Sequence, residues 1–272
     1  MKVDTFFDSL WRDYTAMTPQ AEQIQQAFAN LGETVINDHV AFRTFNHGPI
    51  RLEDLEKFLL EMGYRRNERY RFEAKKLVAY SYLPPVEGQP LIFLSELQTQ
   101  ELSEGTQAII RDLTGQIDPT TVSGPEVFWT GRLWQAPSWE QYQALAKESE
   151  YAAWMAIHGL RVNHFTVSVN ELNGFKTLSE VNDFVTDQGH TLNTVGGIIK
   201  GSEALMLEQS ATMASIQSIE FANGERHDIP TCFYEFAQRF NNPEGKRFMG
   251  FVEGNADKIF ESTHSGHSQK VA

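Results

Sequence analysis

The chain opens with two segments in which apolar residues recur at the spacing of an α-helix. In the first segment, Phe6, Leu10 and Tyr14 fall on one face. The second segment has the same period and stops at Gly32, and glycine is a common residue just beyond a helix end. The pattern therefore predicts a helical start over residues 1–33.

The period then changes to the alternation of a β-strand over residues 38–45. An apolar stripe at helical spacing follows over residues 52–62. Two strand-like apolar runs, residues 77–83 and 91–97, come next and are separated by a turn rich in proline and glycine. The order strand, helix, strand, strand predicts a first module over residues 34–97.

A similar order returns in the second half of the chain. A strand that begins at Val162 carries His164 near its start, much as the strand of the first module carries His39. A helix that ends in glycine follows, and then come three strand-like runs, over residues 197–207, 213–221 and 229–236. The repetition lies in the pattern rather than in residue identity, and it predicts a second module that pairs with the first around one cleft. We expect this module over residues 159–250, with a helical insert over residues 98–158 between the two.

Composition narrows the class of protein and its partners. The chain has 272 residues, of which 41% are hydrophobic and 22% charged, as in an ordinary soluble protein. The net charge of −13 repels nucleic-acid phosphates and anionic membranes, so neither is expected as a partner, although a local cationic pocket for a small anion is compatible with it. We find no signal-peptide pattern and no apolar run near the roughly 20 residues of a membrane span. Cys232 is the only cysteine, which excludes an intrachain disulfide and fits a cytoplasmic location.

The strongest candidate site combines His39, His164 and Glu235. Two imidazoles and one carboxylate are the ligands of a facial metal site that leaves coordination positions open for substrate and O2. Two of these residues belong to the second module, so the first histidine must come across from the other module. Nitrogen and oxygen ligands suit Fe(II), Mn(II), Ni(II) or Zn(II), and the ligand types do not choose among them. Taken singly, each histidine could instead be a hydrogen-bonded residue of the cleft.

Two further residues are candidates for the same site. Glu96 ends a strand of the first module much as Glu235 ends one in the second, and symmetry would make it a fourth ligand or a hydrogen-bonding neighbour of the ligands. Arg43 lies on the strand face of His39, and its guanidinium could bind a substrate carboxylate through two hydrogen bonds. It could equally form an ion pair with a nearby acid such as Asp38 or Glu235. The phosphate-binding, dinucleotide-binding and serine-hydrolase motifs are missing from the sequence.

Four runs of the sequence together resemble the 2-oxoadipate dioxygenase/decarboxylase family, which belongs to the vicinal oxygen chelate superfamily of glyoxalase-like enzymes. They are Asp38-His-Val-Ala-Phe-Arg-Thr-Phe45, Phe93-Leu-Ser-Glu-Leu97, Val162-Asn-His-Phe-Thr166 and Cys232-Phe-Tyr-Glu-Phe-Ala-Gln-Arg239. The runs occur in the family's order, and the resemblance covers residues 1–250. It implies paired βαβββ modules, in agreement with the repeat found above.

The resemblance also implies an Fe(II) site with His39, His164 and Glu235 as metal ligands and Arg43 as the substrate-binding arginine. The implied reaction converts 2-oxoadipate and O2 into 2-hydroxyglutarate and CO2, a step of lysine breakdown. The substrate would bind the metal through its keto oxygen and C1 carboxylate. This chain is short for the family, so the groups that measure substrate length are not carried over, and a similar 2-oxo dicarboxylic acid of another length stays open.

We therefore expect an α+β fold in which paired βαβββ modules form a curved mixed sheet around a metal cleft. Helical segments at the N-terminus and between the modules would cover this single catalytic unit over residues 1–260. Residues 261–272 are polar and aperiodic and are expected to form a mobile tail. The sequence does not predict the oligomeric state.

Two alternatives to the dioxygenase use the same fold. One is a glyoxalase-like lyase, isomerase or hydrolase with Zn(II) or Ni(II), for which Glu96 would serve as the fourth ligand and which would turn over without O2. The other is a non-catalytic binding module in which the three polar residues hold no metal.

Overall fold

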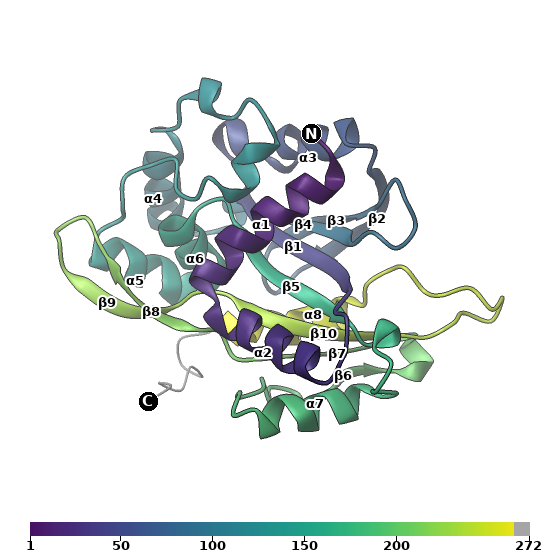
Figure 1. Ribbon diagram of the computed structural model, residues 1–272. Coiled ribbons are helices and arrows are strands. Elements are labelled where there is room, and N and C mark those ends of the chain that lie inside the picture. The colour runs from purple at the N-terminus through teal and green to yellow at the C-terminus, as the bar shows by residue number, and fades with distance from the viewer. Residues whose placement is uncertain (264–272) are drawn as a thin grey trace.

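The computed structural model describes residues 1–263 and contains one large sheet with helices on both faces (Figure 1). The strands are β1 (Asn37–Phe45), β2 (Arg65–Phe72), β3 (Leu77–Leu83), β4 (Leu91–Leu97), β5 (Val162–Ser168), β6 (Lys200–Ser202), β7 (Leu207–Ala211), β8 (Ile216–Glu220), β9 (Arg226–Pro230) and β10 (Phe233–Arg239). The α-helices are α1 (Val3–Met17), α2 (Pro19–Asn30), α3 (Leu52–Glu61), α4 (Glu104–Thr114), α5 (Trp139–Glu148), α6 (Glu150–His158), α7 (Leu178–Asp187) and α8 (Glu253–Ile259), and the short 3₁₀ helix η7 (Phe260–Thr263) follows α8.

The large sheet consists of two similar halves that meet at β1 and β5. Its eight strands run in the order β2-β3-β4-β1-β5-β10-β7-β6. The first half contains β1, α3, β2, β3 and β4, and the second contains β5, α7, β6, β7 and β10, so each has the order strand, helix, three strands. Within each half the first strand pairs in parallel with the last, whereas β1 and β5 pair antiparallel across the boundary. The predicted α+β fold of paired βαβββ modules in a curved mixed sheet is confirmed.

In the first module the structure adds one strand that the sequence pattern did not reveal. Strand β2 has the sequence Arg-Arg-Asn-Glu-Arg-Tyr-Arg-Phe, and its first five residues are exposed. It forms an edge of the sheet, where charged side chains are tolerated and discourage pairing with other chains. The apolar alternation that identifies buried strands is therefore weak here.

The strands predicted in the second module need a correction. The predicted run over 197–207 contains β6 and stops at the first residue of β7, and the run over 229–236 joins the end of β9 to the start of β10. The predicted run over 213–221 forms β8, which pairs with β9 in a separate two-stranded sheet and not with the large sheet. This hairpin is inserted between β7 and β10, and it packs on α5, where His227 stacks on Trp139 with ring centroids 3.7 Å apart. Its side chains are mostly exposed or half-buried, so an apolar pattern alone does not say which sheet it joins.

Alternation along the central strands gives the sheet two different faces. On one face Phe165 of β5 packs against Trp11 and Tyr14 of α1, with ring centroids 5.0 and 5.1 Å apart. Helix α1 crosses this face in Figure 1, and α2 lies beside it. Such aromatic packing supplies much of the buried apolar area that stabilises the fold. The other face carries the polar side chains of the candidate site.

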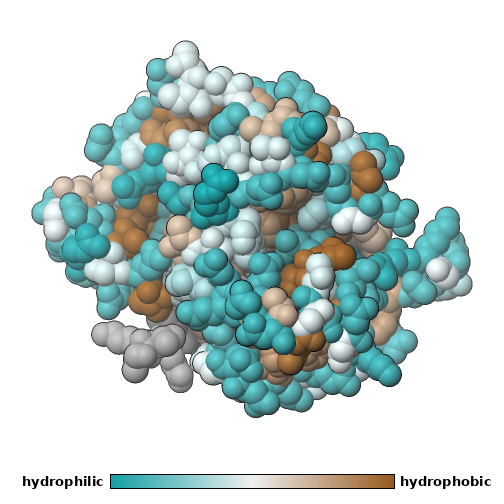
Figure 2. Space-filling view, in the orientation of Figure 1, coloured by the Kyte–Doolittle hydropathy of each residue, from teal (hydrophilic) through white to brown (hydrophobic). Residues whose placement is uncertain are grey.

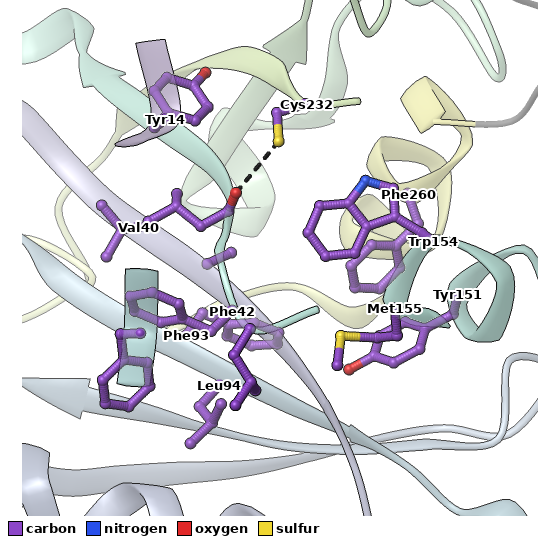
Figure 3. Packing of buried hydrophobic residues seen from close by; sticks show 14 of the residues in the cluster. Tyr14, Val40, Phe42, Phe93, Leu94, Tyr151, Trp154, Met155, Cys232 and Phe260 are labelled. Carbon is purple, nitrogen blue, oxygen red and sulfur yellow. Dashed lines mark hydrogen bonds between the residues drawn. The ribbon is translucent and has the colours of Figure 1, made fainter. Parts of the chain in front are cut away.

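The segment between the modules contains α4, α5 and α6. Helix α6 is buried from Tyr151 to His158. Figure 3 shows Tyr151, Trp154 and Met155 of α6 with Phe260 of η7 among the core side chains. The Tyr151 hydroxyl donates to the Ser95 carbonyl at 2.7 Å and accepts from the Thr44 amide at 2.8 Å, so it ties α6 to β4 and β1.

The surface agrees with the acidic composition. The face seen in Figure 2 is mostly hydrophilic, and its apolar side chains form small separate patches. Over residues 1–263, the helices are too short or too polar to cross a membrane.

We predict that Phe165→Ala lowers the free energy of unfolding by about 3–5 kcal/mol, because it leaves a cavity between β5 and α1. Denaturant unfolding followed by circular dichroism measures the change. Leu60→Ala serves as the control because this leucine on α3 is 44% exposed, and its effect should stay within about 0.5 kcal/mol. Equal losses in the two variants would contradict the packing described here.

Candidate metal centre

Three central strands bring His39, His164 and Glu235 together on the second face of the sheet. They come from β1, β5 and β10, and one potential ligand atom of each lies within 4.8 Å of the others. His39 Nε2 is 3.6 Å from Glu235 Oε1, and His164 Nε2 is 3.2 Å from Glu235 Oε2. All three residues are buried. The cluster predicted from the sequence is thus present as a compact group of two imidazoles and one carboxylate.

Each histidine is oriented by the residue that precedes it. His39 Nδ1 lies 2.7 Å from Asp38 Oδ1, and His164 Nδ1 lies 3.0 Å from Asn163 Oδ1. Both partners are oxygen acceptors, so both rings carry their proton on Nδ1 and turn the lone pair of Nε2 toward the cluster. This arrangement, repeated in the two modules, is the usual support of histidines that bind metals.

Asp38 remains a carboxylate although it is buried. Burial alone would raise the pKa of Asp38, but the ion pair with Arg239 and the contact with His39 hold it well below its usual range. Arg239 Nε and Nη2 donate to the two Asp38 oxygens at 2.7 and 2.9 Å. A negative charge behind His39 makes its imidazole a stronger donor to a cation.

The carboxylate of Glu235 is only partly satisfied by protein donors. Oε1 accepts from Gln209 Nε2 at 2.7 Å, whereas Oε2 has no hydrogen bond within the described residues. Burial raises the pKa of Glu235, and burial together with nearby His39 and Arg43 holds the pKa of His164 well below its usual range. The site therefore contains a neutral His164 imidazole and a buried Glu235 oxygen that has no hydrogen-bond partner within the described residues, which is costly in the absence of a cation. A divalent metal ion fits this donor set.

The cluster opens into a small cavity roofed by the C-terminal part of the chain. The cavity has a volume of about 20 Å³, enough for one water molecule. Its lining residues beyond the cluster are mainly apolar: Phe93, Gln209, Phe251, Ala256, Ile259 and Phe260. Gln209 connects the roof to the cluster, because its Oε1 accepts from Asn255 of α8 at 3.2 Å. Residues 261–263, predicted to belong to a mobile tail, end this roof as part of η7, and residues 264–272 lie outside the described part of the chain.

Arg43 lies beside the cavity and is almost completely buried, with 1% of its surface exposed. Its guanidinium carbon is 5.0 Å from the ring centroids of Tyr151 and Trp154 and 5.7 Å from that of Phe260, which also lines the cavity. Its ion-pair partner is Glu150 at 3.3 Å, and not Asp38 or Glu235 as the sequence suggested. Because Glu150 is far from Arg43 in sequence, no local pattern identifies this pair.

Glu96 is not brought to the cluster. Its Oε2 accepts from the Leu52 amide at the start of α3 at 2.7 Å, and its Oε1 accepts from Gln98 at 2.8 Å. The second module repeats this contact, since Gln238 accepts from the Leu178 amide at the start of α7 at 2.7 Å. Glu96 therefore fixes the helix of its module on the sheet, and the structure does not support it as a fourth ligand.

Strand register explains why the symmetry argument selected Glu96. Thr166 of β5 lies opposite Glu235 of β10. The equivalent residue of β1, Ala41, lies opposite Phe93 of β4. The counterpart of Glu235 is thus Phe93, three residues before Glu96. Because Phe93 is apolar, the first module contributes only one histidine to the cluster, and Phe93 forms part of the apolar lining of the cavity.

Sequence reasoning missed the residues that support the ligands. Asp38 and Asn163 carry a recognisable signal, because each is a short oxygen-bearing side chain directly before a candidate histidine. Gln209 and Arg239 carry none. Gln209 reaches the cluster through the pairing of β7 with β10, and Arg239 reaches it through an ion pair with Asp38 of β1.

Comparison with known proteins links this architecture to one family. The family model described as 2-oxoadipate dioxygenase/decarboxylase matches residues 5–121 and 126–249. A rice (Oryza sativa subsp. japonica) protein named 2-oxoadipate dioxygenase/decarboxylase, chloroplastic/amyloplastic, is 35% identical over 96% of this chain and 79% of its own length.

Two solved structures are similar throughout. The hydroxyglutarate synthase from Oryza sativa in complex with 2-oxoadipate superposes with a TM-score of 0.92, at 34% identity over 96% of this chain and 92% of that one. A protein of Shewanella frigidimarina NCIMB 400 that carries the provisional label of a hydrolase superposes with a TM-score of 0.89, at 42% identity over 93% and 98% of the two chains.

We predict that the protein binds about one equivalent of Fe(II) under anaerobic conditions and that His39→Ala and Glu235→Ala each weaken binding by more than the roughly 10–100-fold typical of losing a residue behind a ligand. Isothermal titration calorimetry measures the affinity. His47→Gln is the control, because the His47 ring contacts Thr114 outside the cluster. Unchanged affinity in the two ligand variants would contradict the assignment.

Proposed function

The chain belongs to the 2-oxoadipate dioxygenase/decarboxylase family, and on that premise we propose that it converts 2-oxoadipate and O2 into 2-hydroxyglutarate and CO2 at an Fe(II) ion held by His39, His164 and Glu235. The observation that carries the proposal is the buried cluster of these three residues, with an unpaired carboxylate oxygen, in a chain that matches the family over both modules. The Shewanella relative's hydrolase label has no matching feature in the site, which lacks a fourth carboxylate ligand within the described residues.

The bound metal would supply open coordination positions for a 2-oxo acid and O2 and the electrons for oxygen activation. The protein's own part is to hold three ligands on one side. Asp38 and Asn163 keep the two Nε2 atoms pointing inward, and Gln209 holds the Glu235 carboxylate. These contacts fix the ligand positions before substrate arrives, which lowers the cost of reaching a reactive geometry.

Arg43 is the proposed binding group for a carboxylate of the substrate. It is a buried cation beside Phe260, a lining residue of the cavity, and its Nε has no hydrogen-bond acceptor in the described residues. An anionic substrate would offset the cost of burying this charge, and a guanidinium can bind a carboxylate through two parallel hydrogen bonds. Such an anchor also turns the 2-oxo end of the molecule toward the metal ligands.

The apolar wall serves to keep water from the reacting groups. Phe93 of β4, Phe251 and Phe260 line the cavity beside the proposed ligands. The cavity has room for about one water molecule, so a 2-oxo dicarboxylate would enter only if the roof formed by α8 and η7 moved. Closure over the substrate would then exclude water from the site during the reaction.

The proposed reaction would place the protein in lysine breakdown, with 2-oxoadipate or a 2-oxo dicarboxylate of similar length as substrate. The cytoplasmic location expected from the single cysteine stays a prediction.

Oxygen consumption by the Fe(II)-loaded protein with 2-oxoadipate tests the proposed function. We expect O2 uptake matched one to one by CO2 and 2-hydroxyglutarate, and its loss in Glu235→Ala, because removal of one ligand empties the site. Uptake is measured with an oxygen electrode and the products by mass spectrometry. Turnover of a glyoxalase-type thioester without O2, or no uptake while iron is bound, would overturn this reaction.

Replacement of Arg43 tests substrate binding separately. Arg43→Lys keeps the charge but loses the paired N–H donors, so we expect KM for 2-oxoadipate to rise roughly tenfold or more. A 2-oxo monocarboxylic acid of similar length serves as the control substrate, and its KM should change much less. Equal changes for the two substrates would mean that Arg43 acts on the fold rather than on the distal carboxylate.

A further inference from the structure

A second, larger cavity lies next to the metal-facing one, and Phe260 lines both. This outer cavity has a volume of about 330 Å³. Charged residues of both signs line it: Lys75, Lys76, Lys147, Glu148, Glu150 and Glu261. The ring of Phe260 therefore separates a roomy polar cavity from the small apolar one that contains the metal ligands.

Arg43 sits at this partition with its hydrogen-bonding capacity only partly used. Nη2 donates to Thr263 Oγ1 at 3.0 Å, and Nε, buried, has no partner within the described residues. Nη1 is 3.3 Å from both carboxylate oxygens of Glu150. Charge-assisted N–H···O bonds are usually about 2.7–2.9 Å long, so the contact between Arg43 and Glu150 is a loose one.

Glu150 reaches Arg43 from the outer cavity. It is the first residue of α6, and 24% of its side chain is exposed although its partner is buried. The helix itself is held in place by Tyr151, which is hydrogen-bonded to β1 and β4. The Glu150 carboxylate can therefore turn into the cavity without disturbing the backbone, whereas Arg43 cannot leave its aromatic surroundings of Tyr151, Trp154 and Phe260.

We propose that the outer cavity admits the anionic substrate and that Glu150 is an internal stand-in for the substrate's distal carboxylate. The stand-in neutralises buried Arg43 while the site is empty, and the entering dicarboxylate displaces it. This inference rests on the proposed role of Arg43. It makes Glu150 a residue that sets both affinity and selectivity for substrates with two carboxylates.

When the substrate displaces Glu150, the ion pair between Arg43 and Glu150 is replaced by one between Arg43 and the substrate carboxylate, so no buried charge is left unpaired. Glu150 moves toward water while a substrate carboxylate takes its place on the guanidinium, so the buried cation stays paired throughout. A 2-oxo acid without the distal carboxylate cannot make this exchange and leaves Glu150 bound. Substrates with one carboxylate are therefore disfavoured for two reasons: Glu150 continues to occupy Arg43, and they lack the distal carboxylate that would bind there.

Calorimetric binding of glutarate to the metal-free protein tests the proposal without iron, O2 or turnover. Glu150→Gln removes the competing charge with little change of shape, and we expect it to lower the Kd of glutarate roughly three- to tenfold. Glu148→Gln is the matched control: it lines the same cavity and makes the same charge change, and its hydrogen bonds go to Ser103 and Thr106 rather than Arg43. Its Kd should change less than twofold.

Two further variants keep the test decisive. Glu150→Asp retains the charge but shortens its reach, so it should also tighten glutarate binding, and it serves if Glu150→Gln lowers the melting temperature. In the Arg43→Gln background the gain from Glu150→Gln should disappear, because the two residues act through one contact. Unchanged or weaker glutarate binding in folded Glu150→Gln or Glu150→Asp would overturn the proposal. Tighter binding in a protein that shows no O2 uptake with 2-oxoadipate would support it while rejecting the proposed reaction.

Discussion

The antiparallel pairing of β1 with β5 is the contact on which the rest of the structure depends. It places His39 of one module beside His164 and Glu235 of the other, so the candidate centre exists only when both modules are joined in one sheet. Neither module alone contains two histidines and an acid at this face. Metal binding requires three ligands at fixed positions and an open side opposite them. The sheet holds the three candidate ligands at fixed positions on one face.

Burial gives this arrangement its chemistry. A carboxylate and two imidazoles in an apolar cavity are costly unless the imidazoles are neutral and a cation meets the carboxylate. Burial supports the first condition for His164, Asp38 and Asn163 orient the two rings, and the second condition is left to a metal ion. The same reasoning explains the surroundings of Arg43, a buried cation whose protein partner Glu150 holds it loosely from a polar cavity. Glu235 and Arg43 are thus buried charged groups whose protein partners leave part of their binding capacity unused.

Much of the fold could be predicted from the amino-acid sequence, because the spacing of apolar residues indicates which side of a helix or strand is buried. The change from helical to alternating spacing located β1 and β5, and the repeated order of elements indicated paired modules. The edge strand β2 was missed because it is largely exposed, and β7 was missed because its residues are mostly polar or small. The run that forms β8 was predicted, but the separate sheet that it makes with β9 was not. The three proposed ligands were found from their residue types and matched positions. Glu96 was selected because its sequence surroundings resemble those of Glu235. The strand register shows that the true counterpart of Glu235 is Phe93, three residues before Glu96. Some residues act only through contacts that form on folding, so no local sequence pattern predicts their roles. These residues are Gln209, Arg239 and Glu150.

In the proposed function these three residues hold an iron ion whose open side chelates a 2-oxo acid. The most direct test is visible absorption spectroscopy of the Fe(II)-loaded protein, titrated with 2-oxoadipate in the absence of O2. Chelation through the keto oxygen and the C1 carboxylate should produce a new charge-transfer band that saturates at one equivalent of substrate and is missing in His39→Ala. A protein that binds one equivalent of iron through His39, His164 and Glu235 but develops no band with 2-oxoadipate would contradict the account.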